Sequence, residues 1–108
     1  MMLRLIDLLL TREDLPEVQN VLDNLDLFIC PNANPDGTYR GGNHTVNGAT
    51  RANAYGVDMN RNYPDPVDGA HPDGEDYAIE TEWFMDLAEE YQFTMAAHYH
   101  GGAEVMNY

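Results

Sequence analysis

Apolar residues recur at helical spacing over the first part of the chain. Residues 1–10 place leucine and isoleucine three to four positions apart, which predicts a helix with one wide apolar face. A second helix is predicted from Asp14, the expected N-cap, through Leu25, since the same spacing continues there. Pro16 falls in the first turn of this helix, where a proline is tolerated.

Two short apolar runs have the pattern of buried strands. Residues 25–30 (LDLFIC) and 93–99 (FTMAAHY) are each bounded by polar or proline residues. Residues 31–74, between them, hold seven of the nine glycines and are therefore predicted to be loop. Apolar and acidic positions occupy opposite faces between Asp76 and Tyr91, which predicts an amphipathic helix of about four turns.

The order helix, strand, loop, helix, strand predicts an α/β fold with helices packed on the faces of a sheet. Ligands of such sheets bind beyond the carboxyl ends of the strands. Two polar motifs lie at these ends, PNANPDG and HYHGGAE. The first contains NPDG, which is by itself a turn sequence. The pattern therefore indicates a site where the two motifs meet.

The charge of the chain excludes several classes of partner. Its 108 residues carry five arginines, no lysine and 19 acidic residues, a formal net charge of −14. No basic stripe could neutralise phosphates, so neither nucleic acid nor an anionic membrane is an expected partner. The longest apolar stretch is interrupted by Arg4 and Asp7 and is far shorter than the roughly 20 residues that span a bilayer. The length suits one domain or part of one.

The chain has a single cysteine, Cys30, which excludes an internal disulfide framework. Because Cys30 ends the apolar run LDLFIC, we expect it to be a buried and unreactive thiol.

His98 and His100 are candidate metal ligands. Residues two apart in a strand point to the same face, so both imidazoles could bind one metal. Gly101 and Gly102 follow directly and would allow a ligand to approach closely. The spacing alone leaves open that one histidine is buried and structural and the other is merely exposed.

Arg51, Asn60 and Arg61 are candidate anion-binding residues. Arginine is scarce in this acidic chain, and a guanidinium binds a carboxylate in bidentate fashion. The alternative is that each arginine only pairs with a nearby acid. Asp58 could orient a metal-bound imidazole or could simply cap the loop.

Taken together, these motifs resemble those of a known enzyme family. NPDG, the segment RANAYGVDMNRNYPD at 51–65 and HYHGGAEVMNY at 98–108 are similar in order and spacing to the M14 zinc metallocarboxypeptidases. The resemblance is greatest to the branch of carboxypeptidases E, N and D, and it spans nearly all of residues 1–108. It implies part of a mixed-sheet catalytic domain with helices on both faces of the sheet.

The resemblance also implies roles for individual residues. His100 matches the third zinc ligand of the family, and Arg51 matches the arginine that polarises the scissile carbonyl and stabilises the oxyanion. Asn60 and Arg61 match the pair that binds the terminal carboxylate of the substrate, and Asp58 matches the aspartate that supports a ligand histidine. The implied reaction is zinc-dependent hydrolysis of the last peptide bond, with peptide or protein C-termini as partners.

Two parts of the family pattern are not found in this sequence. There is no H-x-x-E motif ahead of NPDG to supply the first two zinc ligands, and the family's general-base glutamate lies farther downstream than Tyr108. Residues 1–108 are therefore expected to be a partial M14-like catalytic domain. The isolated chain is expected to be inactive, because one ligand cannot hold a four-coordinate zinc ion.

Two alternatives stay open at this point. In the first, the chain is a non-catalytic module that binds peptide C-terminal carboxylates through Arg51, Asn60 and Arg61. In the second, it is a different metalloprotein, in which Glu104 joins His98 and His100 as a ligand.

Overall fold

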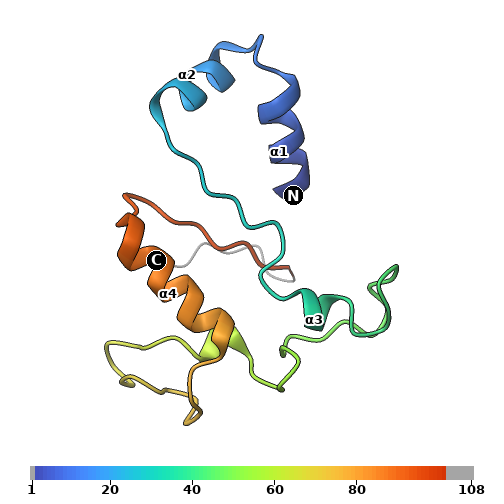
Figure 1. Cartoon of the computed structure of the whole chain (residues 1–108), viewed down its shortest axis with the longest axis vertical. Helices are drawn as coiled ribbons and strands as arrows, with labels where there is room; N and C mark the ends of the chain where they lie inside the picture. The colour runs from blue at the N-terminus through green and yellow to red at the C-terminus, as the bar shows by residue number, and fades with distance from the viewer. Residues whose placement is uncertain (1, 102–108) are drawn as a thin grey trace. The chain divides into compact units, whose positions relative to one another are not determined.

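The computed structural model of the protein describes residues 2–101, and the chain divides into two compact units, Met1–Asp58 and Met59–Tyr108 (Figure 1). The elements of the described residues are α-helices and one short 3-10 helix. They are α1 (Met2–Thr11), α2 (Pro16–Asn24), α3 (Pro35–Thr38), the 3-10 helix η1 (Met59–Arg61) and α4 (Ile79–Tyr91). The three helices predicted from apolar spacing are confirmed as α1, α2 and α4.

Helices α1 and α2 contact one another in the first unit (Figure 1). The contact accompanies burial of Leu9 on α1 and Val18 on α2. Removing these two apolar side chains from water stabilises the two helices. In each helix, the spacing of the apolar residues places them on one face of that helix. The other large leucines of α1 remain exposed.

The expected N-cap of α2 is wrong. The N-cap is Leu15, which makes no side-chain capping hydrogen bond. The Asp14 carboxylate instead accepts hydrogen bonds from Arg12 Nε at 2.8 Å and Arg12 Nη2 at 3.0 Å. The nearby guanidinium competes for the carboxylate that would otherwise cap the helix. The same contact lowers the pKa of Asp14. Pro16 does lie in the first turn, as predicted.

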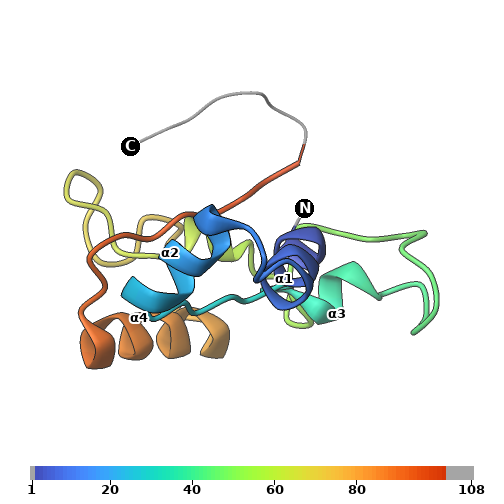
Figure 2. The same ribbon diagram turned by 90° about the horizontal axis from the view of Figure 1, so that it is seen from above.

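The predicted sheet is also wrong. Residues 2–101 contain no strand and are about 39% helical, which does not fit an α/β mixed sheet with helices on both faces. Figure 2 likewise shows coils and loops and no strand arrows. An apolar run indicates a tendency to be buried, whereas a strand also needs hydrogen bonds to a neighbouring strand. Residues 25–30 and 93–99 lack that ladder, and Phe28 and Met95 within them are 50% and 86% exposed.

The buried residues of the described chain are few. The apolar ones are Leu9, Val18, Met59 and Ala78, the polar ones are Asn53, Asn62 and Thr81, and Gly37 of α3 is buried as well. Cys30 is exposed, so the expectation of a buried thiol is wrong. A buried polar group without a hydrogen bond is costly, and the side chains of Asn53 and Asn62 both make hydrogen bonds.

The helices described here are too short and too polar to cross a lipid bilayer.

Helix α4 ends in a left-handed residue. Its C-cap, Gln92, has φ 47° and ψ 56°, and its backbone N–H donates to Ala88 O at 3.0 Å. A side chain at this conformation is strained, and glycine is the residue that relieves the strain. Gln92→Gly is therefore expected to stabilise α4 by about 0.5–1 kcal/mol, which is the left-handed strain of about 1–2 kcal/mol less the entropy cost of glycine of about 0.5–1 kcal/mol.

Thermal unfolding followed by circular dichroism checks this prediction. Glu90→Gly, within α4 itself, is the matched control and is expected to destabilise the helix by about 1 kcal/mol. Equal losses in the two glycine variants would show that the left-handed cap does not limit the stability of α4.

Candidate functional site

The NPDG motif forms a single helical turn that is tied to the backbone around Arg51. Asn34 is the N-cap of α3, and its Oδ1 accepts a hydrogen bond from Gly37 N at 2.8 Å. Asn34 Nδ2 donates to Arg51 O at 2.9 Å, and Thr50 N donates to Gly37 O at 3.0 Å. The turn predicted at this motif is thus confirmed, and it anchors the segment that carries Arg51.

A second asparagine, Asn53, folds the chain back after Arg51. It is 5% exposed, and its Oδ1 accepts hydrogen bonds from Tyr55 N and Val57 N, both at 3.0 Å. Its own backbone N–H donates to Val57 O at 2.9 Å. Side-chain bonds of this kind replace a backbone turn. The turn returns the chain so that Asp58 reaches Arg51.

Arg51 and Asp58 form an ion pair. Asp58 Oδ2 lies 2.9 Å from Arg51 Nε and 2.8 Å from Arg51 Nη2, with side-chain exposures of 65% for the arginine and 33% for the aspartate. The sequence left open whether this arginine pairs with an acid, and in the structure it does. Asp58 thus contacts Arg51, and the support of a ligand histidine that the resemblance implies for Asp58 stays a prediction.

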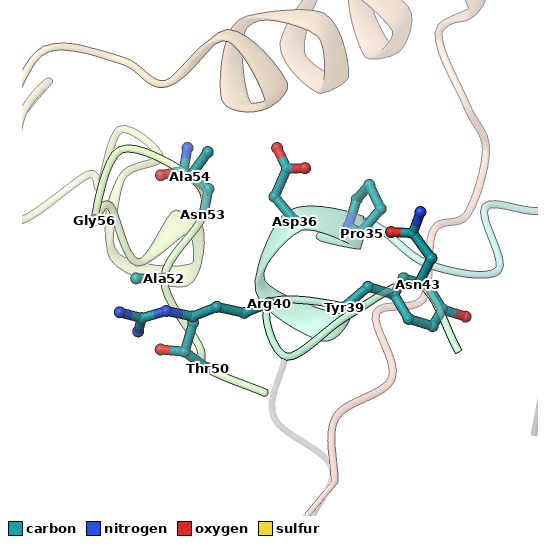
Figure 3. Close-up of a pocket in the computed structure, with 10 residues that line it drawn as sticks. All are labelled: Pro35, Asp36, Tyr39, Arg40, Asn43, Thr50, Ala52, Asn53, Ala54 and Gly56. Carbon is teal, nitrogen blue, oxygen red and sulfur yellow. The ribbon is translucent and has the colours of Figure 1, made fainter. Parts of the chain in front are cut away.

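A pocket of about 550 Å³ lies beside this segment (Figure 3). It lies between the α3 turn, with the residues that follow it, and the 50–56 segment. Thr50 and Ala52, which flank Arg51 in the sequence, contribute to its wall, and so does the buried Asn53. The hydrogen bonds that place Arg51 therefore also shape the wall of this pocket.

Asn60 and Arg61 lie in η1 of the second unit, and both are exposed. Arg61 Nη1 donates to Asn60 O at 2.8 Å. This contact engages one edge of the guanidinium, which has five N–H donors in all. The bond turns the Arg61 side chain back to the backbone carbonyl of the preceding residue, and both residues lie on an exposed turn.

Asn62, directly after this pair, is completely buried. Its Nδ2 donates to Asp73 Oδ2 at 2.8 Å and to Asp76 O at 3.1 Å, and its Oδ1 accepts from Ala78 N at 2.7 Å. Ala78 is the N-cap of α4, so Asn62 joins η1 to the start of that helix. The pKa of Asp73 is lowered, chiefly because the Asn62 amide donates to its carboxylate.

Sequence reasoning missed both Asn53 and Asn62. The signal available was their position in RANAYGVDMNRNYP, where asparagine recurs among glycine and charged residues. An asparagine amide can donate and accept simultaneously, which suits the tying of loops.

Tyr63 follows Asn62 and is half-buried. Burial, and then the negative charge of Glu80, raise the pKa of its phenol. The hydroxyl therefore stays protonated at neutral pH and can act as a hydrogen-bond donor.

His98 and His100 are exposed, and the ring centroid of His98 lies 6.5 Å from that of Phe84. Over residues 2–101, no three histidine, cysteine or acidic side chains gather as a metal site would require. The described residues thus do not fit a zinc site by themselves. Gly102, expected to allow close approach of a ligand, and Glu104, the alternative metal ligand, lie outside the described residues.

The candidate residues fall into two groups. The first unit brings Arg51 to Asp58, and the second holds Asn60 against Arg61 and carries the exposed His100.

Comparison with known proteins gives consistent matches. The family model for zinc carboxypeptidase matches residues 1–108. The chain is similar to carboxypeptidase D of Homo sapiens (33% identical over 100 residues), carboxypeptidase SOL1 of Arabidopsis thaliana (34% over 93) and carboxypeptidase D of Anas platyrhynchos (34% over 99). Each match covers 86% of this chain but only 7%, 17% and 7% of the respective relative.

No solved structure matches the chain significantly. The family model, however, covers the chain from its first residue to its last, including the NPDG turn, the Arg51–Asp58 segment and η1. The chain therefore belongs to the zinc carboxypeptidase family.

Proposed function

We propose that residues 1–108 are part of an M14-like catalytic domain that, when complete, hydrolyses the C-terminal peptide bond of peptides or proteins. The observation that carries this proposal is the family match over the whole chain. Because the chain spans between 7% and 17% of the length of the relatives named above, the activity is assigned to the complete protein.

Arg61 and Asn60 would bind the terminal carboxylate of the substrate. Both side chains are exposed on η1, and the contact of Arg61 with Asn60 O leaves other N–H donors of the guanidinium for a ligand. A planar guanidinium matches a carboxylate better than any other side chain does. In a chain with a net charge of −14, such a cation is a specific feature rather than part of a general basic surface.

Arg51 would stabilise the negative charge that develops on the scissile carbonyl oxygen. Its Nε and Nη2 are engaged by Asp58, and the guanidinium has further N–H donors for an oxyanion.

His100 would be one ligand of zinc in the complete domain, and Asp58 would support another ligand histidine. Zinc acts in such sites as a Lewis acid and as an activator of water. The described residues do not form a metal site, and the roles of Arg51, Asn60 and Arg61 depend on their own hydrogen-bond donors and not on the metal.

A binding experiment tests the carboxylate site on the chain itself. The chain is titrated with a short peptide acid and with the matching peptide amide, in metal-free buffer, and backbone NMR shifts are followed. We expect the acid to bind and the amide not to bind. Arg61→Gln is expected to weaken binding of the acid about tenfold, because a charge-assisted hydrogen bond is lost.

Arg12→Gln is the matched control, since Arg12 is exposed, pairs with Asp14 and belongs to the other unit of the chain. Equal binding of acid and amide, or equal weakening by the two arginine substitutions, would contradict the proposed carboxylate site.

The second candidate is a non-catalytic module that binds peptide C-termini through Arg51, Asn60 and Arg61. It is favoured by the exposure of all three side chains. Release of a C-terminal residue by the complete protein, abolished by Arg61→Gln, would exclude it.

A further inference from the structure

We propose that Asp58 is a positioning residue for Arg51, and that the turn built by Asn53 sets their contact. The inference rests on the proposed function for the role of Arg51, and the contact itself can be tested without substrate or metal. It differs from the role that family resemblance implies for Asp58, which is support of a ligand histidine.

The geometry of the ion pair orients the guanidinium. Asp58 Oδ2 is close to both Nε and Nη2 of Arg51, at 2.9 and 2.8 Å, so the carboxylate binds the side edge of the planar fork. The opposite end of the fork, which carries Nη1, is turned away from the carboxylate because the group is rigid and planar. Asp58 thereby determines which N–H donors Arg51 can present to a substrate oxygen.

The backbone of Arg51 is fixed independently. Its carbonyl oxygen accepts a hydrogen bond from Asn34 Nδ2 at 2.9 Å, and the residue before it, Thr50, donates to Gly37 O at 3.0 Å. The side chain is thus held at both ends, by the NPDG turn at its backbone and by Asp58 at its guanidinium. Restricting a long side chain in advance reduces the entropy lost when it binds a ligand.

Asn53 explains how residues seven positions apart meet. Its Oδ1 accepts hydrogen bonds from Tyr55 N and Val57 N, which closes the turn between Arg51 and Asp58. Since the Asn53 side chain is neutral and 5% exposed, its contribution to the pair is one of geometry rather than charge. A carboxylate has two oxygens, so binding of Arg51 by Oδ2 is compatible with a second hydrogen bond at Oδ1.

Hydrogen exchange of the Arg51 Nε–H, followed by NMR on the metal-free chain, tests the proposal. We expect this proton to exchange more slowly than that of Arg40, which is also exposed and lies in the same unit. Asp58→Asn removes the charge at constant shape and is expected to speed exchange roughly twofold to fivefold, the range for a partly exposed ion pair. Asn53→Ala is expected to have a similar effect without any change in charge.

Asp36→Asn is the matched control and should leave the Arg51 proton unchanged, since Asp36 is an exposed aspartate of the same unit. The Thr50 amide reports whether the fold survives each substitution. Asp58→Glu keeps the negative charge. The Arg51 Nε–H should therefore exchange more slowly in Asp58→Glu than in Asp58→Asn, even if both variants lose some local order.

Equal exchange rates for the Nε–H protons of Arg51 and Arg40 in the parent chain would overturn the proposal. Equal rates for the Arg51 Nε–H in Asp58→Asn and Asp58→Glu would also overturn it. Because these measurements use no peptide, failure of the carboxylate titration leaves them unaffected, and the two proposals can fail separately.

Discussion

Asn62→Ala is expected to destabilise the second unit by about 2–4 kcal/mol, because a buried side chain that makes several hydrogen bonds is lost. Asn62 is completely buried and bonds to Asp73, to Asp76 O and to Ala78 N. Alanine would leave the Ala78 N–H and the Asp76 carbonyl without this partner. Since Ala78 is the N-cap of α4, the loss should be greatest at the first turn of that helix.

Amide exchange at Ala78, together with helical circular dichroism, measures this effect. Asn47→Ala serves as the control because the Asn47 side chain is exposed, and it should change stability by less than about 0.5 kcal/mol. Unchanged protection of the Ala78 amide in Asn62→Ala would show that the asparagine does not hold the start of α4.

Acid provides a second readout of the same substitution. The pKa of Asp73 is lowered in the folded chain, first by the hydrogen bond from Asn62. A lowered folded pKa contributes stability that is present above the unfolded pKa and is lost as the pH falls through the folded pKa. As the pH falls, the free energy of unfolding of the parent chain should therefore decrease more steeply than that of Asn62→Ala. Equal slopes of this free energy against pH would contradict the hydrogen bond between Asn62 and Asp73.

Gly37→Ala is the second substitution with a large expected effect, about 2–3 kcal/mol of destabilisation in the first unit. A Cβ at Gly37 would lie 2.5 Å from Ala52 O and 2.6 Å from Thr50 O, and it would also overlap the Asn34 amide. Two of these obstacles are backbone carbonyls, which cannot rotate away. The NPDG turn must therefore separate from the segment that carries Arg51.

The Thr50 amide, which donates to Gly37 O, should lose its protection from exchange in Gly37→Ala. Gly101→Ala is the matched control, because open space surrounds that position. If both variants kept the Thr50 amide protected, the close contact between the turn and the 50–52 segment would be disproved.

The helices could be predicted from the sequence because their information is local. Apolar spacing located α1, α2 and α4 to within a few residues. The predicted N-cap at Asp14 was wrong because Arg12, two residues earlier, binds the same carboxylate. A capping preference is worth only about 1 kcal/mol and can be outweighed by such a neighbour.

The sheet could not be predicted correctly, because strands depend on partners. Residues 25–30 and 93–99 have strand-like composition, yet composition carries no information on whether a second strand is available to pair with them. In the structure neither segment forms a strand, and their apolar side chains are largely exposed.

The sequence supplied the candidate residues of the site but not the contacts that position them. Charge and motif spacing identified Arg51 and Asp58, which the structure brings together, and Arg61, which contacts the neighbouring Asn60. The contributions of Asn53 and Asn62 were not predicted, because each depends on hydrogen bonds to backbone groups that only the folded turn places. The roles of Arg51, Asp58, Asn60, Arg61 and His100 toward substrate and zinc stay predictions.

The thiol of Cys30 is exposed and therefore accessible to oxidation in air. It is the only thiol of the sequence and lies at the end of the irregular segment that follows α2. An accessible thiol reacts with a second accessible thiol once oxidant is present. Since the sequence has no other cysteine, we expect oxidation to give a covalent dimer joined at Cys30, and a reducing agent to return the single chain.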